Sequence, residues 1–133
     1  MERGGLVIVC DDTEQIRRLI RLNLELEGYA VEEARDGSAL LERLRCGDLP
    51  GVITLDAHMS PRDGWWAIAR IRADARLAEI PVVMVTASVQ QHDRVQASES
   101  GLDAFVSKPF DPDYLVEVIG GFMAEGRGHQ PAP

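Results

Sequence analysis

The sequence is poor in the features that mark disulfide-stabilised, membrane and nucleic-acid-binding proteins. It has only two cysteines, Cys10 and Cys46, so we expect neither a disulfide framework nor a cysteine-bound metal. Its longest apolar stretch, residues 80–87, is far too short to cross a bilayer. Fourteen basic against 22 acidic residues give a formal charge of −8, which disfavours nucleic acids and anionic membranes as direct partners. These deficits predict a cytoplasmic globular protein.

Lysine is also scarce, and the first predicted strand is not followed by a glycine-rich phosphate-binding loop. Thirteen of the 14 basic residues are arginine, and the one lysine, Lys108, suggests a position that needs a compact ammonium group. The residues after the first apolar run read CDDTEQ rather than a glycine-rich loop, which argues against a dinucleotide or flavin site. No Ser-His-Asp or Cys-His set stands where a nucleophilic site would need it.

What is present is a regular alternation of short apolar runs and helical patterns over 133 residues, enough for one domain. The pattern predicts a single five-stranded parallel sheet with helices on both faces. We expect a domain over residues 1–125 and a flexible tail or linker stub over residues 126–133. Strands are predicted at residues 6–10, 29–34, 52–55, 80–85 and 103–107, and helices at 13–27, 38–46, 65–77, 89–100 and from Asp111–Pro112 onward.

Ligands of an open α/β sheet bind outside the carboxyl ends of its strands. Three carboxylates, a hydroxyl and the single lysine stand at these ends. Hard oxygen ligands with room for water favour Mg²⁺, and a hydroxyl with an ammonium group suits a bound phosphoryl group. The strand-end residues are Asp11 and Asp12, Asp56, Thr86 and Ala87, and Lys108.

Four motifs in this order resemble the receiver domain of two-component response regulators, over residues 6–123. They are Asp11-Asp12, LDAHMSPRDGW from residue 55, VTA from residue 85 and FVSKPF from residue 105. The resemblance implies a (βα)₅, flavodoxin-like receiver fold of the stand-alone, chemotaxis-regulator type. One departure lies in the motif at the end of the third strand, after Asp56. The family usually has a proline directly after the methionine, and here that proline is displaced by one position to Pro61.

The resemblance also implies a role for each strand-end residue. Asp56 would be the phosphoacceptor, and Mg²⁺ would be bound by Asp11, Asp12, Asp56 and the backbone carbonyl of His58. Thr86, Ala87 and Lys108 would contact the phosphoryl oxygens. Thr86 and Phe105 would act as the switch that alters the surface made by helix 4, strand 5 and helix 5.

Partners follow from the same resemblance. The phosphodonor would be a histidine kinase or a histidine phosphotransfer protein, and the output an unspecified downstream protein. The chain would be a monomer that can dimerise when phosphorylated. It would be a signalling switch and not an enzyme, catalysing only its own aspartyl phosphorylation and dephosphorylation. Arg17, Arg18 and Arg21 are interpreted as a solvated helix face or, alternatively, as a phosphodonor contact.

Three alternatives stay open. The chain could be the receiver part of a larger regulator, or a receiver-like binding module that takes no phosphate because the displaced Pro61 distorts its loop. The third is a Mg²⁺-dependent phosphohydrolase with an aspartyl nucleophile. That class places a second acid two residues after the nucleophile. This chain has Thr13 at that position after Asp11, and His58 after Asp56.

Overall fold

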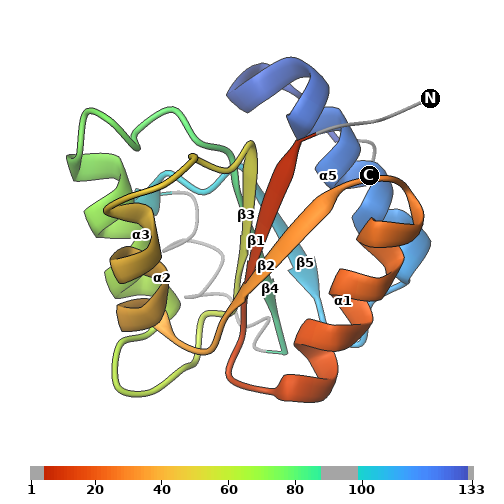
Figure 1. The fold of residues 1–133 in the computed structure, drawn as a ribbon, viewed down its shortest axis with the longest axis horizontal. Helices are drawn as coiled ribbons and strands as arrows, with labels where there is room; N and C mark the ends of the chain where they lie inside the picture. The colour runs from red at the N-terminus through yellow and green to blue at the C-terminus, as the bar shows by residue number, and fades with distance from the viewer. Residues whose placement is uncertain (1–4, 88–98, 132–133) are drawn as a thin grey trace.

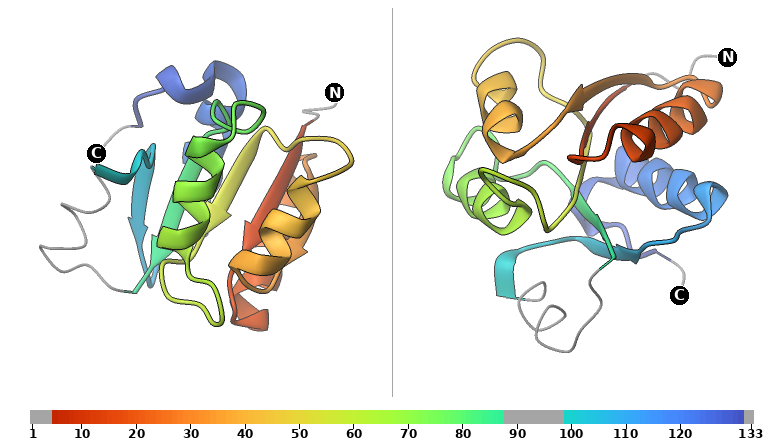
Figure 2. Two further views of the ribbon diagram at one scale, coloured as in Figure 1. Left: turned by 90° about the vertical axis from the view of Figure 1, so that its left-hand side faces the viewer. Right: turned by 90° about the horizontal axis from the view of Figure 1, so that it is seen from below.

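The computed structural model describes residues 5–87 and 99–131, which form one parallel sheet with helices on both faces. The strand order is β2-β1-β3-β4-β5, and every neighbouring pair is parallel, which confirms the predicted sheet. α2 and α3 cover one face and α1 and α5 the other (Figures 1 and 2). The elements are β1 (Leu6–Cys10), α1 (Glu14–Leu26), β2 (Ala30–Ala34), α2 (Gly37–Leu44), β3 (Val52–Leu55), α3 (Gly64–Ala73), β4 (Val82–Thr86), β5 (Ala104–Ser107) and α5 (Pro112–Glu125).

The three inner strands are buried on both sides, which explains their unbroken apolar sequences. Residues of β1, β3 and β4 alternate between two cores. Ile8, Ile53 and Met84 belong to the core under α2 and α3, whereas Val7, Val52 and Val83 belong to the core under α1 and α5. The sheet is therefore a rigid platform that presents its strand ends at one edge.

The apolar face of α1 is narrower than predicted. Only Ile20 and Leu24 are fully buried, while Leu19, Leu22 and Leu26 are 40%, 57% and 74% exposed. The leucines are spread around more of the helix than one sheet can cover, because α1 packs on a single side. The apolar residues between Ile16 and Leu26 predict a wide apolar face, and that prediction is wrong.

The basic side of α1 is tied to the edge strand β2. Arg17 Nε and Arg21 Nη1 lie 2.9 and 3.0 Å from the two carboxylate oxygens of Glu33. The Arg17 side chain is only 14% exposed, so it is not part of a solvated face. The other glutamate of β2, Glu32, pairs with Arg43 of α2, so both acidic residues of this strand have cationic partners.

One predicted helix ends earlier than expected, and another falls mostly outside the described residues. α3 stops at Ala73 and not at residue 77, because Asp74 adopts an extended backbone and its carboxylate accepts the Arg76 N–H, 2.8 Å away. The helix predicted at residues 89–100 lies outside the described residues except for Glu99 and Ser100, which are helical. The helix 4 part of the expected switch surface therefore also lies outside them.

Beyond α5 the chain makes a 3₁₀ turn, Gly126–Gly128, and residues up to 131 are described. This segment was expected to be a tail or linker stub. Arg127 donates hydrogen bonds to Asp103 and to backbone carbonyls, so the segment lies against the folded domain. Among the described residues, no helix is long and apolar enough to span a membrane.

Candidate functional site

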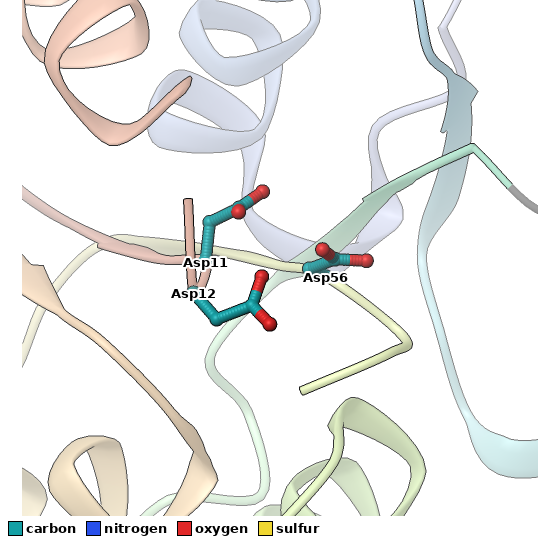
Figure 3. A group of neighbouring side chains, drawn as sticks. All are labelled: Asp11, Asp12 and Asp56. Atoms are coloured by element: carbon teal, nitrogen blue, oxygen red, sulfur yellow. The ribbon is translucent and has the colours of Figure 1, made fainter. Parts of the chain in front are cut away.

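Three carboxylates meet at the carboxyl edge of the sheet. Asp11 and Asp12 follow β1, and Asp56 follows β3, the neighbouring strand. Each offers an oxygen atom, and these three atoms lie within 4.8 Å of one another (Figure 3). Asp11 and Asp56 are buried, at 2% and 7% exposure, whereas Asp12 is exposed. The sequence prediction that strand ends bring these acids together is confirmed.

The backbone fixes Asp11 and Asp56 because both continue the ladder of the sheet. The Asp11 N–H donates to the Ala34 carbonyl at 3.1 Å, and the Asp56 N–H donates to the Cys10 carbonyl at 3.0 Å. The Asp11 carboxylate also accepts the Thr13 N–H at 2.8 Å. These bonds hold two of the three carboxylates in place before any ligand binds.

Arg17 is a positioning residue that the sequence did not reveal. Its Nη1 donates to the Asp11 carbonyl at 2.8 Å while its Nε pairs with Glu33. The guanidinium group thus links the first site loop to the edge strand. In sequence, Arg17 is indistinguishable from its exposed neighbour Arg18, and only the partner on β2 separates their roles.

Lys108 follows β5 and reaches across the sheet edge to two of the acids. Its Nζ lies 2.6 Å from Asp11 Oδ2 and 3.2 Å from Asp56 Oδ2. Its backbone N–H donates to the Thr86 carbonyl at 2.9 Å, which fixes the end of β5 beside β4. The lone lysine therefore belongs to the site, as the sequence predicted.

Burial and ion pairing have opposite effects on the pKa values of Lys108 and Asp11. Burial disfavours the ammonium form of Lys108, but bonding and attraction to Asp11 and Asp56 outweigh it and raise the pKa of the lysine. Burial raises the pKa of Asp11, and the bonds from Lys108 and the Thr13 N–H offset this only in part. Lys108 consequently stays cationic beside the carboxylates.

The loop after β3 wraps closely around Asp56. The His58 N–H donates to Asp56 Oδ1 at 3.2 Å, and the Gly64 N–H donates to the Ala57 carbonyl at 3.0 Å. A Cβ at Gly64 would meet the Asp56 carbonyl oxygen, so only glycine lets α3 begin this close to the acid. Ser60–Pro61 and Lys108–Pro109 are both cis.

The remaining predicted residues lie on β4 and β5 and in the loops that follow β3 and β4. Thr86 is the last residue of β4 and is 1% exposed, and Ala87 follows it on the surface. His58 is exposed in the loop after Asp56. Phe105 lies on β5 opposite Met84 and is half-buried against the core under α2 and α3.

The donor set fits a small hard cation. Three carboxylate groups supply oxygen ligands only, and Asp12 leaves one side of the cluster open to water, which Mg²⁺ retains in part when bound. The cluster concentrates negative charge against a single ammonium group. A divalent cation would relieve the repulsion among the acids, so Asp11, Asp12 and Asp56 can hold Mg²⁺.

Lys108 and a cation should compete for the same carboxylates. We expect Lys108→Met to raise the affinity for Mg²⁺ about tenfold, or about 1.4 kcal/mol, because it frees Asp11 and Asp56 from the ammonium group. Calorimetric titration with Mg²⁺ measures the change. Arg62→Met is the control, because Arg62 is exposed and its guanidinium group lies over the Trp66 ring. An unchanged or weaker affinity in Lys108→Met would contradict the competition.

The comparisons with known proteins agree with this geometry. The family model described as the response regulator receiver domain matches residues 7–120. Among curated proteins, the DNA-binding dual master transcriptional regulator RpaA of Synechocystis sp. is 38% identical over 120 residues. That alignment covers 88% of this chain and 48% of RpaA, so the chain spans about half the length of this relative.

Solved structures have the same architecture. The Francisella response regulator 1452 receiver domain is 25% identical, with a TM-score of 0.83 over 91% of this chain and 98% of that one. A response regulator from Chloroflexus aurantiacus is 25% identical, with a TM-score of 0.85 over 91% and 98% of the two chains. Together with the strand order and the acidic cluster, these matches show that the chain belongs to the response regulator receiver domain family.

Proposed function

We propose that the chain accepts a phosphoryl group on Asp56 from the phosphohistidine of a histidine kinase or histidine phosphotransfer protein. The observation that carries the proposal is the Lys108 ammonium group, which bridges Asp11 and Asp56 beside the three-carboxylate cluster. An Asp56 carboxylate oxygen attacks phosphorus, the N–P bond of the donor breaks, and the imidazole leaves with its electron pair. Later attack by water returns the carboxylate and inorganic phosphate.

Each site residue has a distinct role in this reaction. Asp11, Asp12, Asp56 and the His58 carbonyl would hold Mg²⁺, and the bound ion would supply positive charge to the phosphoryl oxygens. Lys108 moves from Asp56 to a phosphoryl oxygen, and the Thr86 hydroxyl and Ala87 N–H bind others. Arg17 and the ladder bonds of Asp11 keep the cluster preorganised, so little rearrangement is needed for the reaction.

The output is a change of surface. Thr86 at the end of β4 and Phe105 on β5 respond to the phosphoryl group, and the surface of β5 and α5 then binds a downstream protein with altered affinity. The same switch would operate in a stand-alone protein and in the receiver part of a longer regulator.

Intact-mass measurement after incubation with acetyl phosphate and Mg²⁺ tests the proposal. We expect the mass of one phosphoryl group to be added to the wild type and to Asp48→Asn, which alters an exposed aspartate outside the cluster. No addition is expected for Asp56→Asn or after removal of Mg²⁺ by a chelator.

The remaining outcomes are decisive as well. If the wild type gains no mass, beryllofluoride binding read by Trp65 and Trp66 distinguishes rapid hydrolysis from an inert site, because both tryptophans begin α3 directly after the acceptor loop. The absence of both a gain in mass and a tryptophan response to beryllofluoride would overturn the proposal in favour of a binding module. Continuous release of phosphate from small phosphate esters would favour a phosphohydrolase.

A further inference from the structure

The segment that follows α5 is anchored at two points to elements far from it in sequence. Gly126 has a φ of +69°, which favours glycine and turns the chain at the end of α5. Arg127 and His129 then form separate sets of contacts on the folded domain. We call residues 127–131 the return segment.

The first anchor is Arg127. Its Nε lies 2.9 Å from Asp103 Oδ1, and its two terminal nitrogens donate to the Gly101 and Ala78 carbonyls, each at 3.2 Å. The Asp103 side chain is only 6% exposed and also pairs with Arg72. Arg127 therefore enters a preformed acceptor site at the start of β5, composed of one carboxylate and two carbonyls.

The second anchor is His129. Its ring packs edge-on against Phe122, with centroids 5.0 Å apart at 84°, and its Nδ1 lies 2.8 Å from Glu125 Oε1. A Cβ at Gly121 would lie within 2.6 Å of three atoms of the imidazole ring, the nearest being Nε2. The imidazole thus occupies the space that any larger residue at position 121 would fill.

Beyond the first anchor, α5 and the return segment from His129 onward line a partly open hollow of about 330 Å³. The α5 side is formed by Tyr114, Glu117, Val118 and Gly121, and the other side by His129, Gln130 and Pro131. The backbone at His129 is extended, with φ −63° and ψ 140°, and proline follows two residues later. The chain therefore leaves the 3₁₀ turn in an extended conformation at His129 and continues beside α5.

We propose that this face of α5 is a peptide-binding surface whose resident occupant is the return segment, and that a protein partner binds the face only after the segment is released. The proposal rests on the proposed function in one respect, namely that α5 belongs to the output surface. The partner that fits is a segment with an arginine for the Asp103 site and, two residues later, a ring for the Gly121 site. Those are the chemistry and the spacing of Arg127 and His129.

A peptide of residues 126–131 added to the ¹⁵N-labelled full chain tests the competition. In the wild type we expect the amides of residues 127–130 to be ordered and the peptide to change no α5 signal. In Arg127→Ala/His129→Ala the segment should become mobile, and the peptide at about millimolar concentration should shift the signals of Tyr114, Val118 and Gly121.

Gly121→Ala is the decisive variant, because it closes the ring site and should otherwise favour the helix. Added to the released variant, it should abolish the peptide-induced shifts. Gly120→Ala is its control, since a Cβ there approaches only the Tyr29 hydroxyl, at 3.2 Å. Equal shifts in the wild type and the released variant, mobile amides at residues 127–130 in the wild type, or binding unaffected by Gly121→Ala would each overturn the proposal.

Phosphorylation is measured separately on the same variants. We expect the released variant to gain one phosphoryl group from acetyl phosphate as the wild type does, because Arg127 and His129 make no contact with the Asp56 cluster among the described residues. Failure of phosphorylation in all variants with intact peptide competition would refute only the proposed function. The reverse result would refute only the competition.

Discussion

Gly64→Ala should lower the free energy of unfolding by about 3 kcal/mol, which is a large fraction of the stability of a domain this size. The added Cβ would overlap the Asp56 carbonyl oxygen and lie 3.0 Å from Ala57 Cα. Both neighbours are backbone atoms, which cannot rotate away as a side chain could. The higher helix propensity of alanine, about 1 kcal/mol, offsets only part of the strain. Urea unfolding followed by far-UV circular dichroism measures the loss.

The same substitution should impair the site. Relief of the contact requires α3 or the Asp56 backbone to move, and Asp56 is held by the Cys10 carbonyl on its other side. We therefore expect a slower gain of phosphoryl mass from acetyl phosphate under conditions in which the variant is still folded. Gly128→Ala is the control, because no atom lies within 4 Å of the Cβ position at Gly128. Equal stability of the two variants would show that α3 can shift away from Asp56 with little loss in the free energy of unfolding.

The sheet and its acidic edge could be predicted because both depend on local pattern and one general rule. Unbroken apolar runs indicate strands buried on both faces, and parallel strands bring their carboxyl ends to one edge. Asp11 and Asp56 are remote in sequence, yet each directly follows a predicted strand. Lys108 was identified for the same reason, aided by the scarcity of lysine.

Side-chain partners between remote segments could not be predicted in this way. The spacing of Leu19 and Leu22 suits a buried helix face, and only the packing of α1 on one side of the sheet leaves them exposed. Arg17 has the sequence context of a surface residue, because its partner Glu33 is on another element. Asp103 was placed only as the start of a strand, since its partners Arg72 and Arg127 come from two distant helix ends.

Arg72→Met should also lower the free energy of unfolding by about 3 kcal/mol, because the substitution removes the more buried of the two cations on Asp103 together with the donor to three backbone carbonyls. Arg72 Nη2 lies 2.8 Å from Asp103 Oδ2, and its other nitrogens donate to the Ala78, Ile80 and Gly101 carbonyls. The same Asp103 oxygen accepts the Val82 N–H at 2.8 Å, which ties the pair to the start of β4. Urea unfolding measures the loss. Arg35→Met, whose side chain is 83% exposed, should change stability by less than about 0.5 kcal/mol.

Arg127→Met should cost less, about 1 kcal/mol, for two reasons. Arg72 remains on Asp103 when Arg127 is lost, and the two cations repel each other. Burial and the neighbouring Arg127 both lower the pKa of Arg72, so removing Arg127 relieves part of that repulsion. Each arginine also bonds the Ala78 and Gly101 carbonyls, so either one can partly serve the acceptors of the other.

The double variant should therefore lose more stability than the sum of the single losses, because only then is the Asp103 carboxylate left without a cation. Additive losses would mean that the two arginines stabilise the fold independently of each other, which would contradict the sharing of Asp103.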